Sequence, residues 1–139
     1  MIVIDTSAVV AFMNRGDESH DAVRDLIEGS EEDLVTSPLA VAEMDHLVAR
    51  MGGAPAATAL RADLAAGAYQ VEWWGDALAE SLAIAAEHDS LGIGLTDASL
   101  VALAGRMGTT RVATLDEGHF RRVAPLSGEP AFELLPADR

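Results

Sequence analysis

The sequence contains no cysteine and no lysine, and only 4% of its residues are aromatic. Without cysteine, the chain has no disulfide framework, no thiol nucleophile and no thiolate ligands for zinc. Without lysine, it has no Walker A phosphate-binding loop and cannot form a Schiff base. The few aromatic residues also exclude an RNA-recognition sheet on which bases stack.

Negative charge dominates the chain. The 23 Asp and Glu residues outnumber the nine basic residues, all of them Arg, and the net charge is −14. This excess argues against a protein that binds nucleic acid by covering phosphates with a basic face. Half of the 139 residues are hydrophobic, so a single domain over residues 1–139 with a substantial core is predicted. No leader segment or membrane span is recognisable, which predicts a cytoplasmic protein.

Short apolar runs alternate with helical patterns along the chain. Five runs rich in β-branched residues predict strands at residues 2–4, 34–36, 69–73, 111–115 and 132–135. Helices are predicted to begin near residues 8, 17–19 and 38, and to span residues 54–66, 75–88 and 96–107. The Gly-Gly-Ala-Pro segment at residues 52–55 predicts a turn between helices. This alternation predicts an α/β fold with a mainly parallel sheet of about five strands.

Two acidic residues directly follow predicted strands. Asp5 ends the run 2–4, which is apolar at every position, as expected of a parallel strand buried on both faces. Asp116 follows the run 112–115 in the same way. The carboxyl ends of strands form the edge of an open α/β sheet at which ligands bind. The alternatives are that Asp5, or Ser7, caps the next helix and that Asp116 shapes an Asp-x-Gly turn.

Asp97 lies on the apolar stripe of its own predicted helix. The apolar residues of this stripe follow Asp97 at i+3, i+4 and i+7, and they are Leu100, Val101 and Ala104. A carboxylate on a stripe that faces the core needs a hydrogen-bonding partner or a metal ion. The alternative is an acid that complements the helix dipole, with Thr96 as the N-cap.

Glu43 lies on the predicted helix that begins at Pro38. Five residues form the apolar face of that helix: Ala40, Met44, Leu47, Val48 and Met51. At about 100° per residue, Glu43 falls at the border of this face, where it is either partly buried or an ordinary exposed acid.

These four acids occupy positions that can converge at one edge of the sheet. Carboxylates placed close together raise one another's pKa unless a cation joins them. Oxygen ligands without cysteine suit the hard cations Mg²⁺ and Mn²⁺.

At these residues the sequence resembles the PIN-domain ribonucleases, in particular the VapC-type toxins of bacterial toxin–antitoxin pairs. That family opens with a short hydrophobic strand, an Asp and two small polar residues, as the segment Met1–Ser7 does. Its internal Glu matches Glu43, and its third acid begins a helix of small residues, as Asp97 does. Its fourth acid follows a strand and a Thr, as Asp116 does. The resemblance spans the chain from Met1 to about Phe120.

The resemblance implies a three-layer α/β/α fold and hydrolysis of RNA phosphodiester bonds by a water that one or two Mg²⁺ ions activate, with Mn²⁺ able to substitute. Asp5, Asp97 and Asp116 would bind metal, and Glu43 would bind a second ion or orient the water. Metal chemistry of this kind needs no lysine or histidine base. Three hydroxyl residues would support the ligands or a phosphate: Thr6, Ser7 and Thr114.

The family also implies a homodimer that a small VapB-type antitoxin holds inactive, with RNA as the substrate. Two other functions stay open: a PIN-like domain that binds a partner without cleaving, and a PIN-like nuclease that acts on DNA. Glu43-x-x-His46 matches an element that di-iron bundles use in pairs, but it occurs once.

A few arginine and tryptophan residues are candidates for the surface that would receive RNA or a partner. Arg15, Arg50, Arg121 and Arg122 are candidates for phosphate contacts, with isolated surface arginines as the alternative. Trp73 and Trp74 predict core or loop packing, or one ring in the core and the other on a partner surface. The pair His119–Phe120 predicts loop packing.

Overall fold

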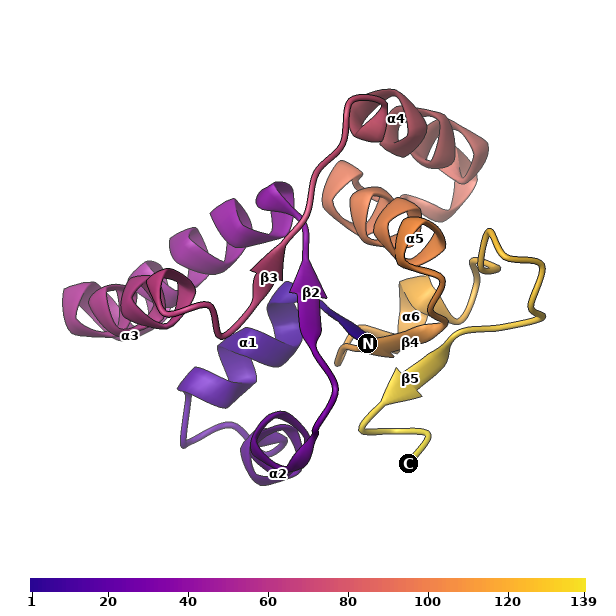
Figure 1. Cartoon of the computed structure of the whole chain (residues 1–139). Coiled ribbons are helices and arrows are strands. Elements are labelled where there is room, and N and C mark those ends of the chain that lie inside the picture. Colours follow the sequence, from indigo (N-terminus) through magenta and orange to yellow (C-terminus); the bar gives the residue numbers. More distant parts are fainter.

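The computed structural model describes residues 1–139 and places a five-stranded sheet at the centre of the molecule (Figure 1). Its strands are β1 (Ile2–Ile4), β2 (Leu34–Thr36), β3 (Gln70–Val71), β4 (Arg111–Ala113) and β5 (Glu133–Leu135). They lie in the order β3-β2-β1-β4-β5, and every neighbouring pair is parallel. The third strand is shorter than the predicted 69–73 because its only neighbour, β2, ends at Thr36, whose carbonyl accepts the last backbone hydrogen bond, from Glu72.

Six helices flank the sheet. They are α1 (Thr6–Met13), α2 (His20–Gly29), α3 (Pro38–Ala65), α4 (Ala77–Glu87), α5 (Leu95–Met107) and α6 (Glu117–Phe120), with a 3₁₀ turn, η1, at Asp89–Leu91. Helices α1, α2 and α3 lie on one side of the sheet and α4 and α5 on the other, which confirms the expected three-layer α/β/α fold (Figure 1). None of the helices combines the length and hydropathy that crossing a bilayer requires.

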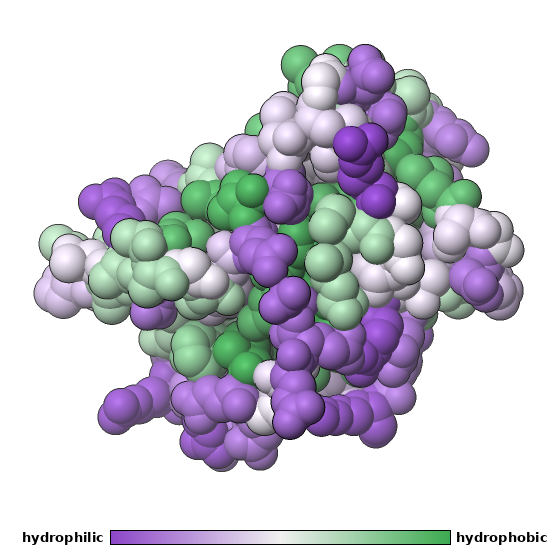
Figure 2. Space-filling model, viewed as in Figure 1, coloured by the Kyte–Doolittle hydropathy of each residue, from purple (hydrophilic) through white to green (hydrophobic).

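The core lies between these layers. All three residues of β1 have no exposed surface, as the uninterrupted apolar run predicts for a central parallel strand. In α5, every residue from 98 to 104 is buried, because α5 packs against α4, the start of α3 and β1. By contrast, α2 buries only Val23 and Leu26, and hydrophilic residues cover the lower part of the surface in Figure 2, where α2 lies.

The strand order places a crevice between the carboxyl ends of β1 and β4. From β1 the chain proceeds to β2 on one side, and from β4 it proceeds to β5 on the other. This reversal is the point at which open α/β sheets bind ligands. Asp5 follows β1 and Asp116 follows β4, while α3 and α5 begin at the same edge of the sheet.

The predicted turn at residues 52–55 is a break within α3. Gly53 has φ 77° and ψ −174°, a conformation essentially restricted to glycine. A Cβ added to Gly52 would lie 2.7 Å from the Ala56 Cβ. Because the helix turns away at this point, Met51 is 62% exposed, although the apolar pattern placed it in the core. The prediction for Met51 is therefore wrong, whereas Val48, one turn earlier, is buried.

Replacement of Gly53 by Ala should lower the free energy of unfolding by about 1–3 kcal/mol, because the side chain is strained at this φ and ψ. Urea denaturation measures the change. Gly29→Ala is the matched control: Gly29 ends α2, and an added Cβ meets nothing within 4 Å. Equal stability of the two variants would show that the break in α3 does not depend on glycine.

Candidate functional site

The four acids that the sequence singled out line one open cavity at the carboxyl edge of the sheet. The cavity measures about 480 Å³. Its walls are formed by Asp5, Thr6, Ser7, Glu43, Leu47, Gly92, Gly94, Leu95, Thr96, Asp97, Asp116 and His119. These residues come from α1, α3, α5, α6 and the segments beside them, so the fold assembles the cavity from distant parts of the chain.

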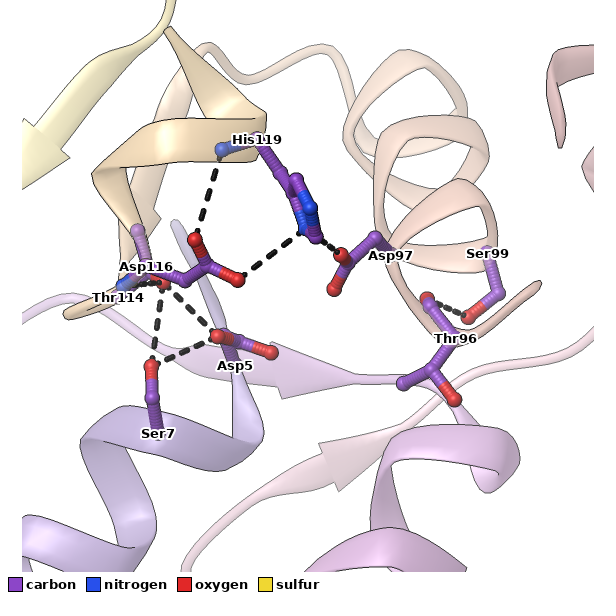
Figure 3. Close-up of polar contacts among 8 residues, drawn as sticks. All are labelled: Asp5, Ser7, Thr96, Asp97, Ser99, Thr114, Asp116 and His119. Atoms are coloured by element: carbon purple, nitrogen blue, oxygen red, sulfur yellow. Dashed lines mark hydrogen bonds and ion pairs between the residues drawn. The ribbon is translucent and has the colours of Figure 1, made fainter. Parts of the chain in front are cut away.

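Asp5 is the most buried of the four acids, with 4% of its surface exposed. It occupies the N-cap position of α1 but makes no side-chain capping bond, so the capping alternative does not account for it. Its Oδ2 accepts hydrogen bonds from Ser7 Oγ at 2.7 Å and from Thr114 Oγ1 at 2.8 Å. No side chain donates to Oδ1 (Figure 3). Burial raises the pKa of Asp5, and the two hydroxyls only partly oppose it.

Ser7 and Thr114 join the ends of β1 and β4. Their hydroxyl oxygens lie 3.2 Å apart. Ser7 Oγ also accepts from the Leu115 N–H at 2.9 Å, and Thr114 Oγ1 accepts from the Asp116 N–H at 2.9 Å. These hydroxyls therefore orient Asp5 directly and fix the backbone that carries Asp116.

Thr6 lines the same cavity as Ser7 but makes a different hydrogen bond from those of Ser7 and Thr114. Its hydroxyl donates to the Ala40 carbonyl at 3.4 Å and not to any of the acids. Thr6 consequently links α1 to α3.

Asp97 stands in the first turn of α5 with 18% of its side chain exposed. The N-cap of this helix is Gly94, so Thr96 does not have the capping role considered above. Burial raises the pKa of Asp97 to about 6, and the charge of Asp5 acts in the same direction. A hydrogen bond with His119 opposes the shift without removing it.

His119 lies between two of the acids. Its Nδ1 is 2.7 Å from Asp97 Oδ2 and 3.2 Å from Asp116 Oδ2 (Figure 3). The prediction of loop packing is thus wrong for His119, although it holds for Phe120, which is buried. The spacing Asp116-x-x-His119 was the available signal, because residues three apart share a face once the segment forms a helical turn.

Asp116 combines two roles. It is the N-cap of α6, and its Oδ1 accepts a long hydrogen bond of 3.5 Å from the His119 N–H. Its Oδ2 faces the His119 ring, and its side chain is 41% exposed. The turn role proposed as an alternative is therefore present, but it engages only one of the two oxygens.

Glu43 stands on the exposed rim of the cavity. Its charge is one of the smaller causes that raise the pKa of Asp5. The helix that carries it is capped by Ser37, whose Oγ accepts from the Ala40 N–H at 3.2 Å. Ser37 Oγ also lies 2.7 Å from Ser99 Oγ, in a fully buried pair that ties α3 to α5. No sequence pattern predicted this link between the two helices that carry Glu43 and Asp97.

No arginine lines the cavity. Arg121 lies outside the cavity lining and forms ion pairs with Glu117 and Asp138, so its surroundings match those of a surface arginine more closely than those of a phosphate contact. Arg15 lines a separate cavity beside α2. The acidic walls of the site are therefore not balanced by any arginine.

The two tryptophans have different surroundings. Trp74 packs partly against the core, donates from Nε1 to Glu80 at 3.1 Å and lies 5.5 Å beneath the Arg106 guanidinium. Trp73 is 39% exposed. Trp74 thus lies partly against the core and Trp73 is exposed, so core packing does not describe both rings.

Comparisons with known proteins agree with the geometry. Residues 2–126 match the family model described as the PIN domain. The chain is 39% identical to Ribonuclease VapC26 of Mycobacterium tuberculosis over 136 residues, which are 97% of this chain and 100% of that protein.

Solved structures similar to this chain include two with the same fold. The crystal structure of Mycobacterium tuberculosis VapC20, described as a sarcin–ricin loop cleaving toxin, superposes with a TM-score of 0.75 at 26% identity, covering 81% of this chain and 87% of that one. PAE2754 from Pyrobaculum aerophilum shares the fold at a TM-score of 0.57 and 24% identity, over 84% of this chain and 81% of that one.

Asp97→Asn should raise the stability of the protein above pH 6 when chelator is present. The folded chain holds the pKa of Asp97 at about 6, against 3.8 for the free side chain. The folded state therefore binds the extra proton between these values, and the free energy of unfolding falls as the pH rises through them. Removal of the charge should add roughly 1–3 kcal/mol at about pH 7.5, and the gain should shrink toward pH 4.

Urea denaturation at both pH values tests this expectation. Asp76→Asn is the control, because Asp76 is exposed and its side chain makes no capping bond. A destabilised Asp97→Asn variant at the higher pH would show that the His119 contact outweighs the burial of the charge.

Proposed function

Because the chain belongs to the PIN-domain family, in its VapC-type branch, we propose that it is an endoribonuclease that hydrolyses RNA phosphodiester bonds with Mg²⁺ or Mn²⁺. The observation that carries the proposal is the convergence of Asp5, Glu43, Asp97 and Asp116 on one cavity. Residues 1–139 would form one PIN domain, of which the family match covers residues 2–126.

The residues of the cavity fit a hard divalent cation. Asp5 keeps one oxygen, Oδ1, free of side-chain donors although the residue is almost fully buried. The pKa values of Asp5 and Asp97 are raised because burial removes water from these carboxylates and because neighbouring acids repel their charge. A divalent cation offsets both effects, and oxygen donors are the ligands that Mg²⁺ and Mn²⁺ prefer.

The acids have distinct roles in this proposal. Asp5, Asp97 and Asp116 hold the cation, which when bound lowers the pKa of water and stabilises charge on the phosphoryl oxygens. Glu43, on the open rim, accepts a hydrogen bond from the attacking water and orients it, or holds a second ion. Ser7 and Thr114 keep Asp5 in position through the bonds to its Oδ2. The products would carry 5′-phosphate and 3′-hydroxyl ends.

The acidic charge of the chain shapes the affinity for RNA. Even with two divalent cations bound, most of the net charge of −14 remains and repels a polyanion. Affinity for RNA should therefore be weak and should depend on the cation.

The proposal includes partners that follow from the family. A VapB-type antitoxin with a basic segment would be drawn to the acidic cavity, because opposite charge steers association. The toxin would form a homodimer and act in the cytoplasm. The names of VapC26 and VapC20 support a toxin–antitoxin context.

Asp97→Asn should lower cleavage of RNA by at least about 100-fold without unfolding the chain, because it removes a charged ligand of the cation. The assay is sequencing of RNA ends after brief expression of each variant, together with cleavage by purified protein with and without EDTA. Asp89→Asn, an exposed acid of η1 outside the cavity, is the matched control and should cleave like the unaltered protein.

Retained cleavage by Asp97→Asn in a preparation free of other nucleases would overturn the assignment. Binding of Mn²⁺ in a calorimeter without cleavage of any RNA would favour the interaction module. Cleavage of single-stranded DNA in preference to RNA would favour the DNA nuclease.

A further inference from the structure

His119 reaches the cavity from a segment that is anchored by the two residues after it. The neighbouring Phe120 is buried, and its ring packs edge-on against Phe132 with the centroids 6.2 Å apart. The next residue, Arg121, is paired with Glu117 and Asp138. The imidazole of His119 remains 35% exposed on the cavity side. The backbone of α6 therefore holds this ring in place between Asp97 and Asp116.

The atoms that face one another need a proton or a cation between them. Nδ1 of His119 lies 2.7 Å from one carboxylate oxygen and 3.2 Å from another. A nitrogen lone pair directed at two carboxylate oxygens at these distances is repelled by both. This repulsion is removed either by a proton on Nδ1, which is then donated to a carboxylate oxygen, or by a metal cation that lies close to the three atoms.

The same separations are those of neighbouring ligands on one metal ion. With metal–ligand bonds of about 2.1 Å, adjacent ligands of an octahedral ion lie about 3 Å apart. The two measured distances bracket this value, and all three ligand atoms of Asp97, Asp116 and His119 lie within 4.8 Å of one another. Small movements suffice to place the three atoms around a common ion.

We propose that His119 is a nitrogen ligand of the divalent cation at this site, alongside Asp97 and Asp116, and that it shifts the preference of the site from Mg²⁺ toward transition-metal ions. This inference rests on the proposed function, since it concerns the same site. Imidazole binds first-row transition ions more strongly than Mg²⁺, which prefers carboxylate and water. An all-carboxylate site has a weaker bias of this kind.

The proposal distinguishes a ligand from a residue that merely orients Asp97. A histidine that only hydrogen-bonds Asp97 changes the affinity for Mg²⁺ and Co²⁺ alike, because it acts through the same carboxylate. A nitrogen ligand affects Co²⁺ far more, because affinities at a mixed nitrogen–oxygen site follow the Irving–Williams order.

The test is pulsed electron paramagnetic resonance of Mn²⁺ bound to the untagged chain, with calorimetric titrations of Mg²⁺ and Co²⁺ in parallel. The unaltered protein should show coupling of Mn²⁺ to a ¹⁴N nucleus. His119→Asn and His119→Ala should lose this coupling, and their affinity for Co²⁺ should fall at least about tenfold with a smaller change for Mg²⁺. His46→Asn is the control, because His46 is exposed one turn from Glu43 and lies outside the cavity lining.

The outcomes separate this inference from the proposed function. Bound Mn²⁺ without nitrogen coupling in the unaltered protein, or coupling that persists in both His119 variants, would overturn the ligand role and leave the carboxylate site intact. Coupling lost only in His46→Asn would also overturn it. Absence of any divalent cation binding by the unaltered protein would overturn the ligand role and the proposed function together.

Discussion

The carboxyl group of Asp5 sets the constraint on which the site depends. It is almost fully buried at the end of the central strand, and the neighbouring charges of Asp97 and Glu43 repel it. Two hydroxyls satisfy one of its oxygens, and the other has no side-chain donor. A buried charge left in this state favours protonation or a cation, and at neutral pH only the cation preserves three ionised acids side by side.

The remainder of the fold maintains this crowding. The reversal of strand order between β1 and β4 brings Asp5 and Asp116 to neighbouring strand ends. The small residues of α5 allow it to pack closely against the sheet and α4, so that its first turn, with Asp97, reaches the same crevice. The buried pair of Ser37 and Ser99 fixes α3 relative to α5. Core packing therefore opposes the electrostatic repulsion that would otherwise separate the acids.

Much of this arrangement could be predicted because it follows from local patterns. An uninterrupted apolar run indicates a central strand, and an acid at its end indicates the functional edge of the sheet, as with Asp5. The contact of His119 with Asp97 and that of Arg121 with Asp138 depend on how the last helical turn and the C-terminal segment fold back, which spacing along the chain does not encode. The exposure of Met51 was not predicted for a related reason. The helical spacing of apolar residues continues through the sequence, whereas the helix itself breaks at Gly53.

The central claim is that a divalent cation occupies the space between the converging carboxylates. The most direct measurement is an anomalous difference map from crystals grown with Mn²⁺, recorded on both sides of the manganese absorption edge. The account predicts a peak in the cavity within bonding distance of Asp5, Asp97 or Asp116. A map with no peak there, from crystals at a pH above the pKa of about 6 that Asp97 has in the folded protein, would contradict it.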